Sequence, residues 1–317
     1  MATDHVDLHA HYVPEFYREA LIAAGITQPD GIKAIPEWSE DLALSTMDRL
    51  GVRTSMLSIS TPGVHFGDDG EAAELARLVN EEAVRLRESH PGRFGFFASL
   101  PLPDVDAAVA ELKYALDVLH ADGIVLETNN DGIYLGDERL EPVYAEAEAR
   151  GTVVFLHPTT PAAAEHLALG YPRPMLEFMF DSTRAVTQLI LCGMLERHPA
   201  LRVIVPHAGA ALPVLANRIE LLLPLLCRPG TPIPDFRKAL RALHFDLAGA
   251  PVPELLGALL SVADPAHLHY GSDFPFTPAD ACVGLNEKLL ATDQLDGETR
   301  RGVFGGNAHA LFPRLAR

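Results

Sequence analysis

The sequence has little of what several classes of protein need. Cysteine occurs only three times in 317 residues, at Cys192, Cys227 and Cys282, and no two of them form a CxxC pair. This argues against a disulfide framework and against a thiolate zinc site. The 25 lysines and arginines are outnumbered by 43 aspartates and glutamates, which gives a net charge of −18. A chain this acidic lacks the basic face that nucleic acids and anionic membranes require, so a small molecule is the expected partner.

Long apolar segments are also missing. No run of 18 apolar residues occurs, and the leucine-rich stretch Leu221–Leu226 is far too short to span a bilayer. The first nine positions carry acidic residues and histidines instead of a basic region followed by an apolar one, so no signal peptide is expected. Hydrophobic residues make up 48% and charged residues 21%, as in globular proteins with a packed core. We therefore expect a cytoplasmic protein with a single domain over residues 1–317.

Short β-rich runs alternate with helical patterns along the whole chain. The runs favour strands at residues 6–9, 53–60, 94–99, 123–127, 152–157, 202–206, 243–246 and 267–271, with helices near 39–50, 69–90, 104–120, 138–150, 174–198, 210–226, 251–262 and 278–291. Eight repeats of this kind predict a parallel sheet closed into a (β/α)8 TIM barrel, with extra C-terminal helices over residues 295–317. The proline-rich stretch 227–234 is expected to form a loop over the barrel mouth.

Two histidines near the start of the chain are the most informative local feature. His9 and His11 are one residue apart on a predicted strand, so both imidazoles point to the same face. In a chain with 14 histidines such a pair is weak on its own. Three further predicted strands, however, end close to His157, His207 and Asp273. Because the carboxyl ends of barrel strands meet on one rim, all five residues are predicted to be neighbours.

This set of side chains indicates a metal site. Imidazole and carboxylate ligands without thiolate suit zinc, manganese or iron(II). Three histidines and one aspartate leave a coordination position for water or substrate, which points to catalysis.

Other residues near the same rim are candidates for binding a flat substrate. Tyr12, Phe274 and Phe276 lie near strand ends or in rim loops, and they are expected to form an aromatic wall. Glu127 and Asn129 lie at the end of the fourth predicted strand, where we expect polar contacts to ring substituents.

Five segments together resemble a known family. They are His9-Ala10-His11, His157-Pro158, His207–Pro213, Gly271–Pro275 and Gly306–Ala308, and they extend over nearly the whole chain. This pattern resembles the metal-dependent amidohydrolase superfamily, in the branch of aminocarboxymuconate-semialdehyde decarboxylase. Residues 96–101 and 134–137 are most similar to the salicylate-type decarboxylases of that branch, which include 6-methylsalicylate and γ-resorcylate decarboxylases. The resemblance implies non-oxidative loss of CO2 from a phenolic aromatic acid.

The resemblance also implies roles for individual residues. His9, His11, His157 and Asp273 would bind one divalent metal ion, with Zn²⁺ expected first and Mn²⁺ as the alternative. His207 would be an acid/base beside the metal. Either Asp273 or His207 would then deliver the proton to the ring, and the sequence does not choose between them.

Arg218 follows His207 by eleven residues, as does a family arginine that reaches into a neighbouring subunit's site. The resemblance therefore implies a homodimer in which Arg218 pairs with the substrate carboxylate in the partner's barrel. The alternative from the residues alone is an exposed position on the amphipathic helix Leu212–Leu226.

A rival function keeps the same site and changes the reaction. A metal-bound hydroxide, with His207 as base, would hydrolyse a lactone or hydrate an unsaturated carboxylic acid. A non-catalytic binding protein is disfavoured, because every expected metal position is filled. The sequence fixes neither the ring substituents, nor the native metal, nor whether the reaction reverses.

Overall fold

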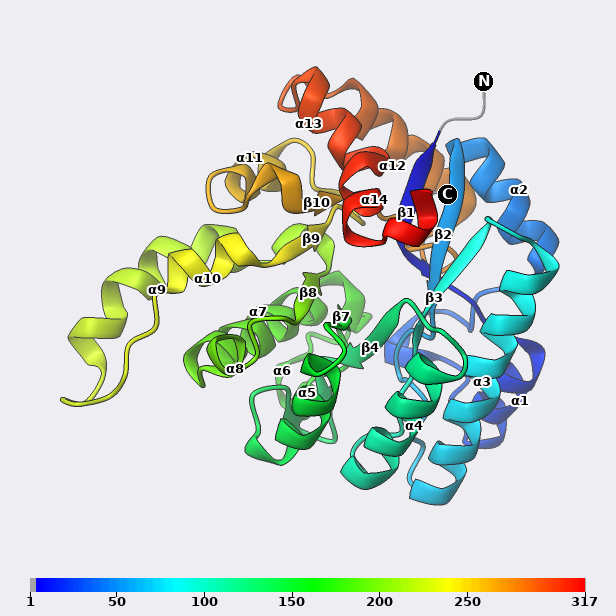
Figure 1. Cartoon of the computed structure of the whole chain (residues 1–317), viewed down its shortest axis with the longest axis horizontal. Helices are drawn as coiled ribbons and strands as arrows, with labels where there is room; N and C mark the ends of the chain where they lie inside the picture. The colour runs from blue at the N-terminus through cyan, green and yellow to red at the C-terminus, as the bar shows by residue number, and fades with distance from the viewer. Residues whose placement is uncertain (1–3, 317) are drawn as a thin grey trace.

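A parallel sheet of eight strands forms the centre of the computed structural model, which describes residues 4–316 (Figure 1). Around the barrel the strands are β1 (His5–His11), β2 (Val52–Ser58), β3 (Phe94–Ala98), β4 (Gly123–Glu127), β7 (Val153–His157), β8 (Arg202–Val205), β9 (His244–Asp246) and β10 (Leu268–His269). The chain following β10 returns to β1: Leu8 N donates to Tyr270 O over 2.9 Å, and His11 N donates to Phe274 O over 2.7 Å. These bonds close the sheet, so the predicted (β/α)8 barrel is confirmed.

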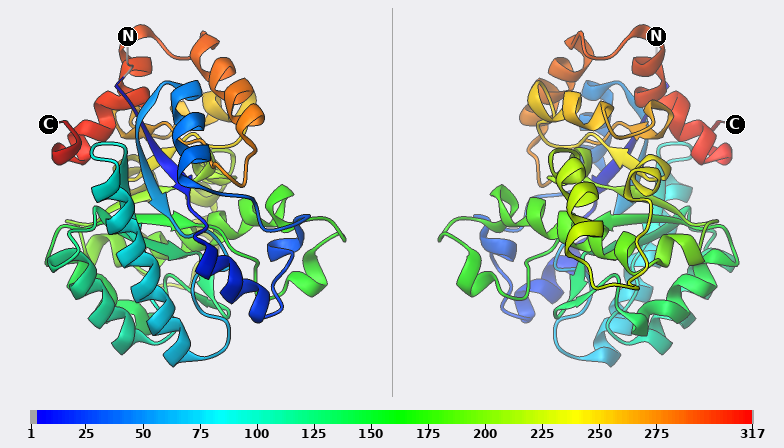
Figure 2. Two further views of the ribbon diagram at one scale, coloured as in Figure 1. Left: turned by 90° about the vertical axis from the view of Figure 1, so that its right-hand side faces the viewer. Right: turned by 90° about the vertical axis from the view of Figure 1, so that its left-hand side faces the viewer.

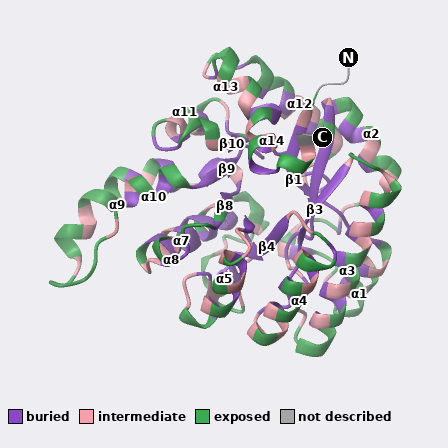
Figure 3. Cartoon of the chain, in the orientation of Figure 1, coloured by how far each residue is buried: buried purple, intermediate pink, exposed green. Residues whose placement is uncertain are grey.

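Helices surround the barrel and turn one face to it (Figure 3). They are α1 (Glu15–Ala23), α2 (Glu40–Leu50), α3 (Asp69–Ser89), α4 (Val105–Asp117), α5 (Glu141–Glu148), α6 (Ala164–Leu167), α7 (Glu177–Leu191), α8 (Met194–Arg197), α9 (Leu212–Leu226), α10 (Phe236–Ala242), α11 (Glu254–Leu260), α12 (Ala279–Ala291), α13 (Gly297–Arg301) and α14 (Asn307–Leu311). Several begin at a side-chain cap, as where Asp68 accepts from Glu71 N before α3. The expected C-terminal helices are α13 and α14.

An irregularity in β1 turns the two histidines into the barrel. Val6 and Leu8 pack in the barrel interior, whereas Ala10 belongs to the apolar layer between barrel and helices. If the side chains alternated strictly from Leu8 onward, Ala10 would point into the barrel, and His9 and His11 would point into the outer layer. The pairing of β1 with β2 shifts between Asp7 and Ala10, however, so the alternation changes there. Leu8 and His9 consequently both point inward.

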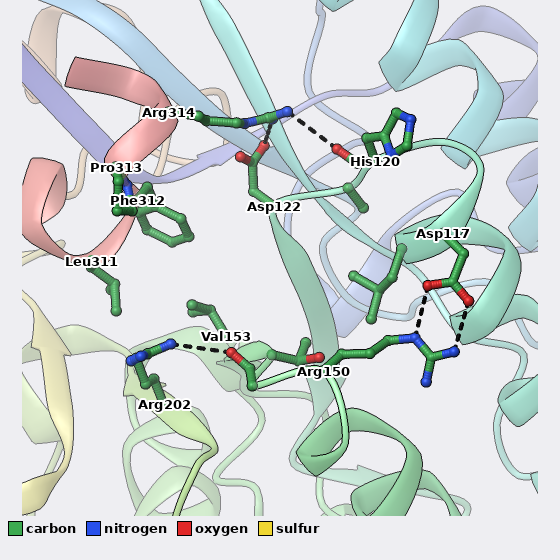
Figure 4. A pocket seen from close by; sticks show the side chains of 14 residues that line it. Asp117, His120, Asp122, Arg150, Val153, Arg202, Leu311, Phe312, Pro313 and Arg314 are labelled. Carbon is green, nitrogen blue, oxygen red and sulfur yellow. Dashed lines mark hydrogen bonds and ion pairs between the residues drawn. The ribbon is translucent and has the colours of Figure 1, made fainter. Parts of the chain in front are cut away.

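The C-terminal segment covers the amino-terminal end of the barrel. Leu311 and Phe312 pack against the interior cluster, and Arg314 forms an ion pair with the buried Asp122. Figure 4 shows the pocket of about 420 Å³ between this segment and the starts of the neighbouring strands. Its two aspartates are both paired with arginines, so ion pairs close this end of the molecule.

Several parts of the fold were not expected from the sequence. Among them are α1, α6, α10 and a short hairpin of β5 (Asn129–Asn130) and β6 (Ile133–Tyr134). The predicted loop at 227–234 follows α9, which extends away from the barrel in Figure 1. It contributes no residue to the cavity at the barrel mouth, so its expected place over that mouth is wrong. Within residues 4–316, no helix combines the length and apolar character needed to cross a membrane.

Three histidines pack together at the start of the last two strands. His244 Nδ1 and His269 Nε2 share a hydrogen bond of 2.9 Å, and the ring of His267 lies 4.2 Å from that of His244. Burial, with the nearby His267 and Arg202, lowers the pKa of His244 to about 3, against the smaller opposing effect of Asp264. Burial and the two other imidazoles also hold the pKa of His269 well below its ordinary value.

This cluster predicts loss of stability in acid. Both imidazoles stay neutral in the fold and gain a proton on unfolding below about pH 6.5. Stability should therefore fall as the pH drops from about 6.5 towards 3, by up to about 1.4 kcal/mol per pH unit for each histidine. Replacing His244 with Phe should flatten the dependence of the unfolding free energy on pH in urea titrations, whereas the exposed control His166→Gln should not. Equal slopes in His244→Phe and wild type would contradict this interpretation.

Candidate active site

Four side chains converge at the carboxyl end of the barrel. His9 and His11 come from β1, His157 ends β7, and Asp273 follows β10. Each offers one ligand atom, and these atoms all lie within 4.8 Å of one another. His9 Nε2 is 3.1 Å from His11 Nε2, and Asp273 Oδ1 lies 3.5 Å and 3.3 Å from the two nitrogens. Lone pairs that face each other at this spacing suit a bound cation, so the residues present fit a divalent metal.

The far side of each β1 histidine is held by a fixed partner. His9 Nδ1 donates to Asp246 Oδ2 over 2.9 Å, and His11 Nδ1 hydrogen-bonds with Ser58 Oγ over 3.0 Å. Both Nε2 atoms are thereby left to face the centre. Partners of this kind fix the tautomer and the ring orientation of metal-binding histidines.

The charges around the centre favour a cation. Burial works against a charged imidazole, yet Asp246 and Asp273 raise the pKa of His9 to about 10. Burial also works against the Asp273 carboxylate, but hydrogen bonds from His11 and His9 hold its pKa well below the ordinary value. The carboxylates of Asp246 and Asp273 therefore stay ionised in a buried site, with the protonated imidazole of His9 between them. A dication would satisfy the same carboxylates.

His207 lies beside this group on a strained turn. Its ring centre is 5.0 Å from that of His9, and its Nδ1 is buried without a hydrogen-bond partner in residues 4–316. His207, Ala208 and Ala210 all have φ of 54°, and Asp273 has φ of 60°. Residues other than glycine rarely adopt such backbone angles, and those that do cluster at active sites. Burial and the nearby His9 lower the pKa of His207.

A cavity of about 740 Å³ opens next to these residues. His157, His207 and Asp273 line it, together with Phe276, whose ring centre is 5.4 Å from that of His11. Much of the wall is apolar, and it includes Ile32, Met175, Phe178, Met179 and Leu255. Two segments from distant parts of the chain, around η1 (Pro29–Gly31) and η3 (Arg173–Met175), lie side by side at its edge (Figure 2). The cavity has the size and polarity of a small-molecule site.

The structure brings only some of the candidate binding residues to this cavity. Phe276 lines it, whereas Tyr12, Phe274, Glu127 and Asn129 do not. Tyr12, which follows β1, and Phe274, which follows β10, are both buried in the apolar layer between barrel and helices.

Glu127 and Asn129 are held behind the site. Glu127 Oε2 lies 3.6 Å from His157 Nδ1, and burial together with Asp30 and Asp181 raises the pKa of Glu127 well above the ordinary value. Asn129 Nδ2 donates to the buried Asp181 over 3.0 Å. Contact of these two side chains with a substrate, which we expected, therefore has no support in their placement.

Arg218 is exposed on α9 and does not line the cavity of its own chain. Within residues 4–316 no hydrogen bond or ion pair holds its guanidinium. Its position therefore leaves the expected role across a subunit interface open.

Sequence reasoning missed two residues of the site. Asp246 binds His9 and also accepts from His207 N over 3.0 Å, so it joins the two parts of the site. It ends a strand that the sequence predicts, and an acid at a strand end is a signal that could have identified it. Ser60, which lines the cavity 3.3 Å from His157 Nε2, offered no such signal.

Residues 6–314 match the Amidohydro_2 family, described as amidohydrolase, and the chain belongs to that family. It is 38% identical over 315 residues to a 6-methylsalicylic acid decarboxylase of Penicillium expansum, covering 98% of this chain and 96% of that protein. It is 28% identical over 230 residues to a gamma-resorcylate decarboxylase of Rhodococcus jostii, covering 68% and 70%.

Solved structures agree on the fold. One described as an amidohydrolase II has a TM-score of 0.93 at 37% identity and covers 98% of this chain and all of that one. A dihydroxybenzoic acid decarboxylase from Polaromonas, described with bound manganese and 2-nitroresorcinol, has a TM-score of 0.85 at 21% identity and covers 99% and 98%. At that identity the second likeness shows the fold alone.

Replacing His157 should separate metal binding from catalysis. We expect about one divalent ion per wild-type chain, because a buried set of three imidazoles and one carboxylate binds zinc or manganese tightly. His157→Ala should lose most of this ion after dialysis, as measured by elemental analysis. The matched control is His207→Ala, which should keep it, because His207 is not among the four converging ligands. Unchanged occupancy in His157→Ala would rule out His157 as a ligand.

Proposed function

We propose that the protein is a metal-dependent, non-oxidative decarboxylase of a salicylate-type phenolic acid, a carbon–carbon lyase that releases CO2. The observation that carries this proposal is the pairing of the four-ligand centre with His207 at one end of a largely apolar cavity. Its support from relatives is the 38% identity to a 6-methylsalicylic acid decarboxylase over nearly the full length of both chains.

His9, His11, His157 and Asp273 would hold one divalent ion. When bound, the metal would supply positive charge that attracts a 2-hydroxybenzoate and stabilises the negative charge that develops on it during the reaction. We propose zinc, which imidazole-rich sites bind more tightly than manganese. Manganese, the ion in the Polaromonas structure, is the alternative. Reconstituting the metal-free protein with zinc or with manganese and comparing the two activities would distinguish these ions.

His207 is the proposed proton donor. Its ring lines the cavity and is not among the four converging ligands, whereas the carboxylate of Asp273 would be bound to the metal. His207 would take up a proton from solvent and deliver it to the ring carbon that bears the carboxylate. The carbon–carbon bond would then break, its electron pair would restore the aromatic ring, and CO2 would leave. Solvent would return the proton to His207.

The cavity wall favours a substrate with an alkyl substituent. A ring hydroxyl placed against Ile32, Met175 and Met179 would find no hydrogen-bond partner in these side chains and would lose its bonds to water there. A methyl group gains from the same surroundings. We therefore propose an alkyl salicylate, such as 6-methylsalicylate, over a dihydroxybenzoate.

We further propose that the protein is a homodimer. The outward face of α9 exposes Leu221 and Leu225, of which 64% and 67% are accessible, and α7 exposes Phe180 beside a shallow apolar groove. Apolar surface of this extent on a projecting helix is typical of an interface. The proposed occupant is a second copy, because Arg218 on α9 faces no partner in its own chain. Its guanidinium would pair with a substrate carboxylate in the other barrel.

We also propose that residues 1–317 act as one domain and that the protein works in the cytoplasm. The support for both is the sequence, in which a single run of strand and helix repeats contains few cysteines.

A substrate panel tests the reaction. Incubation with 6-methylsalicylate should release CO2 and 3-methylphenol, with kcat/KM about tenfold or more above that for 2,6-dihydroxybenzoate, because a buried hydroxyl without a partner costs more than 1.4 kcal/mol. His207→Ala should lose about a hundred- to ten-thousand-fold in kcat, the usual contribution of an acid/base group. Turnover of lactones or unsaturated acids by wild type, without CO2 release from any hydroxybenzoate, would instead favour the hydrolase or hydratase reaction.

Mixed dimers test Arg218. Arg218→Ala and His157→Ala should each be nearly inactive, but a dimer of one chain of each contains one intact site and one doubly damaged site. After joint unfolding and refolding, half of the dimers are mixed, so activity should recover to about a quarter of wild type. Wild type refolded alone is the control. A mixture that stays as inactive as its parents would show that Arg218 does not act across subunits.

A further inference from the structure

One of the three ligand histidines differs from the other two. The Nδ1 atoms of His9 and His11 have partners at 2.9 Å and 3.0 Å. His157 Nδ1 is buried as well, yet it has no hydrogen-bond partner in residues 4–316. The oxygen that faces it is Oε2 of Glu127, at 3.6 Å, just beyond hydrogen-bond distance.

Glu127 is in the same condition. Its Oε2 is buried and likewise has no hydrogen-bond partner in the part of the chain that the structure describes. No cationic side chain forms an ion pair with it there, apart from the imidazole of His157 at 3.6 Å. A buried carboxyl oxygen without a hydrogen-bond partner costs free energy, and so does a buried imidazole nitrogen. That these two unpaired atoms face each other therefore needs a physical explanation.

The sheet fixes these two residues opposite each other. Glu127 ends β4, His157 ends β7, and the two are direct partners in the parallel pairing of these strands. Gly63 packs beside Glu127, since a Cβ there would lie in ordinary van der Waals contact with Glu127 Cγ, at 3.5 Å. Since Glu127 does not line the main cavity, it is placed to contact the histidine and not a substrate.

We propose that Glu127 is a positioning residue for His157, and that it accepts a hydrogen bond from Nδ1–H when Nε2 binds the metal. This rests on the metal centre of the proposed function. A metal ion on Nε2 requires the proton of the neutral imidazole to be on Nδ1, where Glu127 Oε2 is the acceptor within reach. Closing the gap of 3.6 Å needs a shift of less than 1 Å. Metal binding is thereby coupled to the junction of β4 and β7.

Zinc affinity without substrate tests this role. The metal-free wild type and variants are titrated with Zn²⁺ against a chelating dye. Glu127→Met, which keeps the length of the side chain and removes the acceptor, should weaken zinc binding by about 10- to 100-fold. Glu127→Gln, whose amide oxygen can still accept, should lose less, though about threefold or more. If thermal unfolding shows that Glu127→Met does not fold, the zinc affinity of Glu127→Gln alone tests the proposal.

Glu111→Gln is the matched control. Glu111 is also a buried glutamate, but it pairs with Arg77 and Asn80 and with none of the metal ligands. It should lower stability and leave zinc affinity within about twofold of wild type. Zinc binding by Glu127→Met and Glu127→Gln as tight as that of the control would overturn the proposal.

Because no substrate is present, this result is independent of decarboxylation. A wild type that binds zinc but releases no CO2 would refute the proposed function and leave the role of Glu127 intact.

Discussion

The carboxylate of Asp246 holds the two halves of the site together. One oxygen accepts from His9 Nδ1, and the other accepts from the backbone N–H of His207 and of Ala248. It is fully buried, so solvent screens none of these bonds. A single side chain at the end of β9 therefore sets the orientation of the His9 ring and the position of the His207 backbone. The strained backbone conformation at His207 persists because hydrogen bonds such as the one from His207 N to Asp246 hold it in place.

The barrel supplies the remaining constraint. Its parallel strands bring side chains from β1, β7 and β10 to one rim, although they lie as far apart in sequence as His9 and Asp273. The return of the chain after β10 to β1 does more than close the sheet. Asp273 N donates to His9 O over 2.7 Å, so the backbone that completes the barrel also positions a carboxylate beside the histidines. Fold and site depend on the same hydrogen bonds.

The sequence predicted the barrel and the convergence of His9, His11, His157, His207 and Asp273 because strand ends in such a fold must meet. Alternation after the inward-facing His11 also accounts for Tyr12, which is buried in the outer layer. The sequence could not predict which other side chains face the cavity. The cavity walls around Asp30 and Met175 belong to turn-rich segments without periodicity, whose placement is decided by tertiary packing.

The central claim is that four side chains hold one catalytic metal ion with His207 beside it. Anomalous X-ray diffraction at the zinc absorption edge, from crystals of the zinc-loaded protein, tests it most directly. We expect one anomalous peak at about 2.0–2.2 Å from Nε2 of His9, His11 and His157 and from a carboxylate oxygen of Asp273, with the His207 ring outside bonding distance. A peak bonded to His207 in place of one of these ligands, or no peak between the four side chains, would contradict it.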